Sequence, residues 1–389
     1  MKIVQIGSFP LDLSCIQGGV ESSVYGLSSE LIKNNRVCVI DIPRQHLKAD
    51  KVEIMEGIEV FRFWNKGKSN TSALQRLKAI ISTIKKLAPD ICHIHSTSLF
   101  SLSVYLLLKI YRIPVITTVH GLAHIEKRNI WKKQRNIKNL IKYLSQSVTE
   151  FFYIGISHDL IVDTDYVKSA IELYKLQHKI FHLPVFNVVP QGINPVFFNL
   201  TSEPKRNHLL SVGSINRRKG HLLLLKSMQK VKESVPDFKL TIAGVLSDEI
   251  YYGELIAAVT NYDLNENIQF KTNASFEEVL ALYRSAEIFV LHSQEESQGI
   301  VFCEAMAARM PIVATNVGGI PWVVQNNING LLSDFGDIDT FANNIIKLMN
   351  DESVRVKMSE LNHIQSNQYN WKLVTEKIVG VYDLIIQNS

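Results

Sequence analysis

Short runs of apolar residues alternate with longer stretches in which apolar residues recur every three or four positions. The short runs predict buried strands and the longer stretches predict amphipathic helices, an alternation typical of α/β folds with parallel sheets. In the first half we expect strands at 2–6, 37–41, 59–63, 91–95, 115–119, 152–156 and 187–189, and helices at 21–34, 72–87 and 98–110. In the second half we expect strands at 209–212, 239–242, 268–270, 288–291, 312–314 and 330–332, and helices at 219–231, 276–283, 301–308 and 339–349.

A short polar segment containing prolines separates these two halves. We therefore expect two doubly wound, Rossmann-like domains, residues 1–195 and 208–370, joined by a linker at 196–207. Residues 371–389 are expected to form a C-terminal helix that packs back on the first domain. Two such sheets facing each other leave a cleft, and their ligands bind where the carboxyl ends of strands meet loops and helix N-termini.

The composition is that of an ordinary globular protein. Of 389 residues, 46% are hydrophobic and 20% charged, which excludes wholesale disorder and collagen-like repeats. No apolar run approaches the ~18 residues that a membrane span needs, and the chain starts on a buried strand rather than a secretory signal. Four scattered cysteines suggest neither disulfides nor a zinc site, so we expect a protein of the cytoplasm.

Charge is distributed unevenly. Residues 1–195 carry 25 Lys and Arg against 15 Asp and Glu, whereas the whole chain has a net charge of only +5. The segment from Lys127 to Lys142 contains no acid, and its cations are interleaved with Trp, Ile and Leu. This is what a helix lying on an anionic membrane needs, although a solvated basic helix face has the same pattern. No recognised nucleic-acid-binding module accompanies it, so nucleic acid is not expected as a partner.

The strongest candidate for chemistry follows an expected strand in the second half. Gly299 opens a helix there, so that the amides of Ile300 and Val301 and the helix dipole would favour a phosphate. Glu296 in the loop and Glu304 inside the helix can each accept hydrogen bonds from the vicinal hydroxyls of a sugar or a ribose. Taken alone, the pattern also fits a capped helix with two solvated acids.

With the segment that follows, which ends a strand in Gly318-Gly319, the chain resembles the retaining family-4 glycosyltransferases of the GT-B fold. Their motif has two glutamates with seven residues between them, as Glu296 and Glu304 have here. Gln298 stands where an aromatic residue is usual, and Arg309 where glycine is usual. The resemblance extends over nearly the whole chain and implies the GT-B fold, with two Rossmann-like domains facing across a cleft.

A basic turn after the first strand of the second half resembles the phosphate loop of this family. It consists of Arg217, Arg218 and Lys219, followed by Gly220. Cations at the start of a helix can neutralise a diphosphate leaving group as its charge develops. Lys219 falls where the family's lysine does. The family's usual arginine is Ser214 here, so either Arg217 or Arg218 takes its role.

The first half contributes a glycine pair and three histidines at strand ends. Gly18 and Gly19 resemble the loop that closes over the donor phosphate. His120 matches the family's active-site histidine. His93 and His95 end another strand, and the sequence leaves open whether they are structural or belong to the site.

Two Asp-x-Asp triplets raise the question of a metal ion, because some glycosyltransferases of another fold hold a divalent cation that way. They are Asp163 with Asp165, and Asp337 with Asp339, and each lies at the start of an expected helix. We interpret both as helix N-cap acids. No metal and no cofactor beyond the donor substrate is expected.

The resemblance implies a retaining, metal-independent hexosyltransferase. It would move a sugar from a UDP- or GDP-linked donor to a glycan or lipid-linked acceptor in cell-surface polysaccharide or glycolipid synthesis. The enzyme would be cytoplasmic or peripheral on the inner face of the membrane. We expect Glu304 to hold the ribose, Lys219 with Arg218 the diphosphate, Glu296 with the amides of 299–301 the donor sugar and phosphate, and His120 the sugar near the reaction centre.

Two other functions fit the same pattern. A sugar-nucleotide epimerase on this fold would use acids of the cleft to move protons and would need no acceptor. A non-catalytic carbohydrate- or membrane-binding protein would keep the fold but turn over no donor. The basic stretch in the first half favours a transferase with a lipid-linked acceptor over the epimerase, and the intact Glu296, Glu304, Lys219 and His120 argue against a relict cleft.

Overall fold

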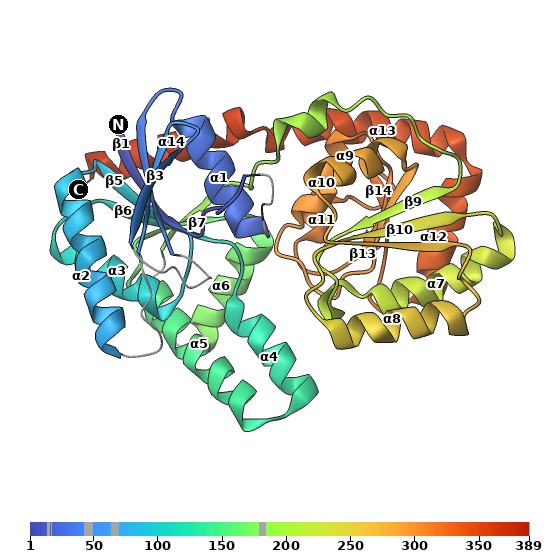
Figure 1. The fold of residues 1–389 in the computed structure, drawn as a ribbon, viewed down its shortest axis with the longest axis horizontal. Helices are drawn as coiled ribbons and strands as arrows, with labels where there is room; N and C mark the ends of the chain where they lie inside the picture. The colour runs from blue at the N-terminus through green and yellow to red at the C-terminus, as the bar shows by residue number, and fades with distance from the viewer. Residues whose placement is uncertain (14–15, 17, 43–49, 64–69, 179–183, 389) are drawn as a thin grey trace. The chain divides into compact units, whose positions relative to one another are not determined.

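The structure is a computed structural model that describes residues 1–13, 16, 18–42, 50–63, 70–178 and 184–388. The chain divides into two compact units (Figure 1). Unit 1 consists of Met1–Gln191 together with Trp371–Ser389, and unit 2 of Gly192–Asn370. Each unit has a sheet of mainly parallel strands with helices on both faces, as the alternation of strands and helices predicts.

The sheet of unit 1 has eight strands in the order β3-β4-β2-β1-β5-β6-β7-β8. The edge strand β3 is antiparallel to β4, and the other neighbours are parallel. The strands are β1 (Lys2–Gly7), β2 (Arg36–Asp41), β3 (Lys51–Met55), β4 (Ile58–Arg62), β5 (Ile91–Ile94), β6 (Val115–Val119), β7 (Asp159–Val162) and β8 (Val185–Val188).

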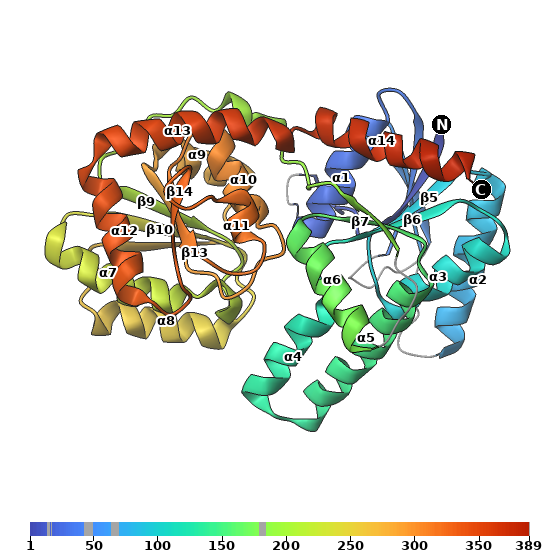
Figure 2. The ribbon, with the colours of Figure 1, turned by 180° about the vertical axis from the view of Figure 1, so that it is seen from behind.

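Helices cover this sheet on both sides because successive strand residues point to opposite faces. In β1, Val4 and Ile6 pack with α2 and α3, whereas Ile3 packs with α1 and α14. Figure 2 shows α14 lying along the sheet beside α1. The helices of unit 1 are α1 (Gly19–Leu31), α2 (Asn70–Leu87), α3 (Leu99–Ile110), α4 (Ala123–Gln134), α5 (Ile137–Ile156), α6 (Asp165–Gln177) and α14 (Trp371–Gln387).

The C-terminal helix α14 is tightly fitted to unit 1. A Cβ atom at Gly26 of α1 would lie 2.3 Å from Cε2 of Trp371, so only glycine leaves room for the indole. Val374, Ile378 and Tyr382 are buried along the same side of α14. The contact therefore joins the last helix of the chain to strands formed near its beginning.

Unit 2 has six parallel strands in the order β11-β10-β9-β12-β13-β14. The strands are β9 (His208–Val212), β10 (Lys239–Gly244), β11 (Ile268–Thr272), β12 (Ile288–Leu291), β13 (Ile312–Thr315) and β14 (Gly330–Ser333). One face packs on α7 (His221–Ser234), α8 (Glu249–Asn261) and α12 (Ile338–Asn350). The other packs on α9 (Phe276–Ser285), α10 (Ile300–Ala307) and α11 (Ile320–Val323), while α13 (Glu352–Ser366) packs along α10.

Two expectations differ from the structure. The strand expected at 152–156 is wrong, because these residues form the last turn and a half of α5 and β7 follows at Asp159–Val162. That apolar run is too short to show whether its period is two or 3.6. Residues 196–207, expected as a linker, belong to unit 2, since the 3₁₀ helix η1 (Pro195–Asn199) buries Phe197 in its core.

Among the described residues, no helix has the length and apolar character needed to cross a membrane. The pair α4–α5 projects from the rest of unit 1 in both views (Figures 1 and 2).

Candidate active site

In unit 2, loops after two neighbouring strands bring basic and acidic side chains together. Lys219 follows β9 and Glu296 follows β12, and Lys219 Nζ donates a hydrogen bond to Glu296 Oε1. Arg218 Nη1 lies 3.7 Å from Oε2 of the same carboxylate, and Ser293 Oγ donates to Oε1 at 2.9 Å. Lys219 and Glu296 are only 7% and 5% exposed. The spacing of these residues thus places a buried ion pair at the carboxyl edge of the sheet.

The carboxylate of Glu296 is held in its ionised form. Burial raises its pKa, but the positive charges of Lys219 and Arg218 and the hydrogen bonds outweigh burial, and the net effect lowers the pKa. The carboxylate of Glu296 therefore stays ionised at neutral pH. A polar ligand that offers equivalent hydrogen bonds can replace one partner of such a buried ion pair.

Glycines fix the backbone beneath Glu296. A Cβ at Gly318, where φ is +56°, would lie 2.2 Å from the carbonyl oxygen of Glu296. A Cβ at Gly319 would lie 1.7 Å from the carbonyl oxygen of Ser297, and the amide of Gly319 donates to the Glu296 carbonyl at 2.8 Å. Gly318-Gly319 is therefore required for the close approach of two backbone segments that holds the Glu296 loop in place.

The helix α10 starts directly after this loop. Gly299 is its N-cap with a φ of +78°, and Ile300 and Val301 are its first residues, whose amides cannot bond within the helix. Glu304 lies one turn further on and accepts a hydrogen bond from the hydroxyl of Tyr283 at 3.1 Å. Burial raises the pKa of Glu304 to about 7, although Tyr283 and the charge of Lys219 lower it. The carboxylate of Glu304 and the free amides of Ile300 and Val301 thus lie within the first turns of α10.

The structure separates the two arginines that the sequence left equivalent. Arg217 pairs with Glu254 of α8, and its guanidinium lies 5.1 Å from the centre of the Tyr251 ring. Arg218 instead faces Glu296 and donates to the carbonyl of Glu295 at 3.3 Å. Of the two, Arg218 joins the charged cluster with Lys219.

In unit 1, His120 directly follows β6 and lies against two other strand ends. Its Nδ1 is 3.3 Å from Asp163 Oδ2, and its Nε2 is 3.3 Å from His95 Nδ1. Gln191 Nε2 donates to Asp163 Oδ2 at 2.5 Å. Asp163 is 2% exposed, and its Oδ1 has no hydrogen-bond partner among the described residues. These side chains line a small cavity whose wall also includes Thr118 and Trp371.

The expectation that Asp163 caps a helix is wrong. Thr164 is the N-cap of α6, since its side chain accepts from the amide of Val167, and Asp165 lies in the first turn. Asp163 is one residue too early and turns toward His120. Asp337, in contrast, is the N-cap of α12, and its carboxylate accepts from the amide of Thr340. In the described part of the chain, no three His, Cys, Asp or Glu side chains gather as metal ligands do.

The other strand-end histidines face inward. His93 is fully buried, with Nε2 2.6 Å from Thr118 Oγ1 and Nδ1 2.6 Å from the hydroxyl of Tyr382. His95 bonds to Gln5 and His120. The contacts of Gln5 and Tyr382 could not be predicted from the sequence, because these residues lie outside the motifs and only the fold brings them to the histidines.

The glycine pair of the first half lies at the start of α1. Gly18 is its N-cap with a φ of +89°, Gly19 is its first residue, and both are exposed. Gln17, which precedes them in the motif, is outside the described residues. The connection between β1 and α1 begins near Phe9, whose carbonyl accepts a hydrogen bond from the buried Arg62 at 3.2 Å.

Comparison with known families covers both units. Residues 17–185 match the family Glycosyltransferase Family 4, and residues 193–363 match Glycosyl transferases group 1. The chain belongs to the group 1, family 4 glycosyltransferases. The predicted family membership is thereby confirmed. These enzymes use nucleotide-sugar donors, retain the configuration of the transferred sugar and need no metal ion.

Individual relatives agree with this assignment. A D-inositol 3-phosphate glycosyltransferase of Corynebacterium jeikeium is 25% identical over 299 residues, which are 72% of this chain and 68% of the relative. Sucrose-phosphate synthase of Thermosynechococcus elongatus superposes with a TM-score of 0.83 at 18% identity over the whole of both chains. HepE of Anabaena, solved in complex with UDP-glucose, has a TM-score of 0.73 at 16% identity over 98% of this chain and 99% of its own. The predicted GT-B fold is thus confirmed.

Proposed function

We propose that this glycosyltransferase transfers a hexosyl group from a UDP-linked donor to a lipid-linked glycan acceptor, in the synthesis of a cell-surface polysaccharide or glycolipid. The observation that carries the proposal is the buried ion pair of Lys219 and Glu296, with the half-exposed Arg218 beside it, at the N-terminus of α10. It combines positive charge for a diphosphate with a carboxylate for sugar hydroxyls. The UDP-glucose complex of the structurally similar HepE favours UDP over GDP as the leaving nucleotide.

Each group of the cluster has a partner on such a donor. Lys219 and Arg218 would exchange Glu296 for the diphosphate, and Glu296 would then accept from hydroxyls of the donor sugar. The amides at the start of α10 would bind a phosphate oxygen, which the helix dipole favours. Glu304, one turn along α10, would accept from the ribose hydroxyls in place of Tyr283. Gly18 and Gly19 would close over the donor phosphate.

The chemistry needs no protein nucleophile. The bond from the anomeric carbon to the diphosphate breaks, and the acceptor oxygen bonds to the same face of the sugar. The acceptor's proton passes to the leaving phosphate oxygen. Negative charge grows on the diphosphate in the transition state, so Lys219 and Arg218 stabilise that state more than the bound donor. His120 would contact the sugar near the reacting carbon.

The acceptor side of the proposal rests on the surface of α5. Ile137, Ile141, Leu144, Val148 and Phe152 recur every three or four residues and are each at least 50% exposed. Side chains at this spacing lie on one face of a helix. We call this row the α5 stripe. A row of exposed large apolar residues on a projecting helix fits insertion into a lipid interface.

The charge around the α5 stripe favours an anionic bilayer over another protein surface as its partner. Between Lys127 and Thr149 the chain has no acidic residue. Lys138 and Lys142 are exposed on α5 along one side of the stripe, and Lys132 is exposed on α4. Each cation near an anionic surface adds up to about 1 kcal/mol of binding. A lipid-linked acceptor would be presented at the same surface.

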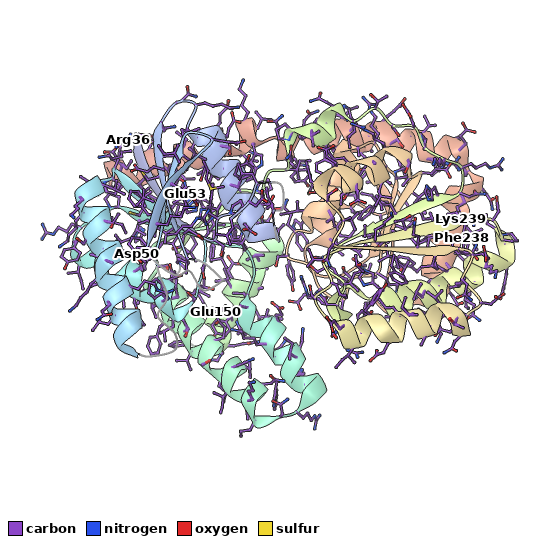
Figure 3. All side chains as sticks on the ribbon, in the orientation of Figure 1. Arg36, Asp50, Glu53, Glu150, Phe238 and Lys239 are labelled. Carbon is purple, nitrogen blue, oxygen red and sulfur yellow. The ribbon has the colours of Figure 1, made fainter. Side chains whose placement is uncertain are left out.

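The basic stretch that would contact the membrane differs in the structure from the single helix that its pattern suggests. The basic run does not form one helix but bends at Arg135, where φ is +44°, between α4 and α5. Trp131, expected to face the membrane, stacks on Tyr143 with ring centres 6.0 Å apart and so helps to join the two helices. Glu150, marked on α5 in Figure 3, accepts from the amides of Ala123 and His124 and fixes the start of α4.

Vesicle sedimentation tests the membrane contact. Replacing Leu144 and Val148 with Ser, or Lys138 and Lys142 with Ser, should each release the protein from vesicles rich in phosphatidylglycerol. Wild-type binding should fall as salt rises, because the Debye length shrinks to about 8 Å at 0.15 M. Lys226→Ser with Lys357→Ser, which removes two exposed lysines of unit 2, is the matched control. Equal pelleting of all variants would refute the contact.

Donor screening tests the proposed reaction. A thermal-shift screen across UDP-, GDP- and ADP-sugars should show stabilisation by UDP-sugars, since a ligand that binds the native state raises the unfolding temperature. Transfer of labelled sugar to an extract of lipid-linked glycans should follow. An isomeric sugar formed without acceptor would show an epimerase instead. Absence of turnover with every donor would favour a non-catalytic carbohydrate-binding protein.

A further inference from the structure

A chain of buried hydrogen bonds runs behind His120 and ends on the C-terminal helix. His95 Nε2 lies 2.6 Å from Gln5 Oε1. Gln5 Nε2 donates to the hydroxyl of Tyr382 at 3.1 Å, and that hydroxyl is 2.6 Å from His93 Nδ1. Apart from His120, every member is 2% exposed or less. A hydroxyl of α14 is thereby connected to the proposed active-site histidine through side chains of β1 and β5.

The inner histidines of this chain are neutral. Burial and the neighbouring charge of His120 lower the pKa of His93 to about 3, and burial lowers that of His95 well below its usual value. A neutral imidazole has one nitrogen that donates and one that accepts. Each hydrogen bond therefore dictates the direction of the next.

The carboxamide of Gln5 decides which nitrogen of His95 carries the proton. Its oxygen faces His95, so Nε2 of His95 donates to it and Nδ1 is left as an acceptor. His120 Nε2, 3.3 Å from that Nδ1, is then the donor of this contact. The carboxylate of Asp163 can only accept, so Nδ1 of His120 donates to it and both nitrogens of this ring act as donors. If the carboxamide were turned over, all these bonds would reverse and His95 would donate to His120. The position of one amide therefore sets the direction of the hydrogen bond between His95 and His120.

His120 is the member with the longest hydrogen bonds. Both of its contacts, to Asp163 and to His95, are 3.3 Å, whereas the inner bonds among His95, Gln5, Tyr382 and His93 are 2.6–3.1 Å. A sugar hydroxyl can replace one of the two outer partners without disturbing the inner chain. The inner hydrogen bonds thus hold His95 in place, while His120 can exchange a hydrogen-bond partner for a ligand.

Packing alone does not call for a tyrosine at position 382. Its neighbours on α14 along the buried side are apolar, among them Ile378 and Ile385. A phenylalanine would fill the same space, and a buried hydroxyl costs free energy unless it is hydrogen-bonded. Here the hydroxyl meets Gln5 and His93, both of which would lose a partner without it.

We propose that Tyr382, acting through Gln5 and His95, is a positioning residue that fixes the ring orientation and proton placement of His120 for sugar transfer. The inference rests on the proposed role of His120 in that reaction. It makes the C-terminal helix α14 a support of the proposed site in unit 1.

Tyr382→Phe tests the inference, with Tyr153→Phe as its matched control. Tyr153 is equally buried, and its hydroxyl bonds to Thr117 at 2.9 Å, outside the chain of bonds behind His120. Tyr382→Phe should lower kcat on the order of tenfold, less than the hundredfold that a 1 Å misplacement can cost, with little change in KM for the donor. Tyr153→Phe should leave both unchanged. Gln5→Met, which keeps the volume, should act like Tyr382→Phe.

A double-mutant cycle separates positioning from general damage. In a His120→Ala background, Tyr382→Phe should have no further effect on kcat, because the residue it positions is gone. Nitrogen-15 NMR of the histidine rings should show a changed protonation pattern at His95 in Tyr382→Phe and an unchanged one in Tyr153→Phe. Additive losses, or equal losses in Tyr382→Phe and Tyr153→Phe, would overturn the inference. If His120→Ala itself transfers sugar normally, the proposed role of His120 fails instead.

Discussion

The two units build their polar sites in opposite ways. In unit 2, Lys219, Arg218 and Glu296 form a cluster of full charges on loops at one sheet edge. In unit 1, His93 and His95 are neutral and fully enclosed, and one carboxylate, Asp163, meets the network at its outer end. The comparison indicates a division of labour: unit 2 can balance the charge of a diphosphate, whereas unit 1 can orient an uncharged sugar.

The largest effect should come from removing the cation at the centre of unit 2. Lys219→Ala should lower kcat by about 10²–10³, with a smaller change in donor KM, because the charge on the leaving diphosphate grows in the transition state. Steady-state kinetics with a UDP-sugar measure this, and Lys226→Ala, an exposed lysine of α7, is the control. Equal losses in kcat and in donor affinity would restrict Lys219 to ground-state binding.

The next effect concerns the nucleotide alone. Glu304→Ala should weaken UDP binding about 10- to 150-fold, the range expected for a charged hydrogen bond of about 1.5–3 kcal/mol. Calorimetric titration with UDP measures it without turnover. His120→Ala should leave UDP affinity unchanged, since the proposed contact of His120 is with the sugar. Unaltered UDP affinity in Glu304→Ala would show that the ribose lies elsewhere.

The pH dependence of nucleotide binding sharpens this assignment. The pKa of Glu304 is raised to about 7, so the acid is largely protonated below that pH and becomes a better acceptor for ribose hydroxyls above it. UDP affinity should therefore rise from pH 6 to pH 8, and the rise should be smaller in Glu304→Gln, which cannot ionise. The difference between the two titration series removes the contribution of the nucleotide's own phosphates. Identical pH profiles would contradict the assignment.

The smallest effect should separate the two arginines. Arg218→Ala should lower kcat about tenfold, because a charge-assisted hydrogen bond to the diphosphate is lost. Arg217→Ala should change kcat less than twofold, because Arg217 pairs with Glu254 on an exposed surface, where such pairs contribute little. The reverse order would mean that Arg217 leaves Glu254 to reach the donor.

The two units also differ in how much of each site could be predicted from the sequence. The unit 2 site lies in two short segments, 216–220 and 293–304. The family's local motifs, together with the rule that ligands bind at the carboxyl ends of strands, were therefore enough to locate it. What spacing could not decide was which arginine turns inward, because that depends on Glu254 and Tyr251 of α8.

The unit 1 site was predicted only in part. His120 was found at a strand end, but its neighbours come from β1, β5, the end of β7 and α14, which only the folded sheet brings together. The pattern predicts a helix cap at Asp163 because the actual N-cap, Thr164, is the next residue. The two-unit α/β fold was predictable. The exceptions include 152–156, where an apolar helix end has the composition of a strand, and the expected linker 196–207, which belongs to unit 2.

Hydrogen–deuterium exchange with UDP and with a UDP-sugar tests the division of labour most directly. UDP alone should slow exchange in residues 213–221 and 293–304 of unit 2 and leave residues 118–124 of unit 1 unaffected. The UDP-sugar should protect the same segments of unit 2 and add protection at 118–124. Protection of 118–124 by UDP alone, or no protection of 213–221 and 293–304 by either ligand, would contradict the account.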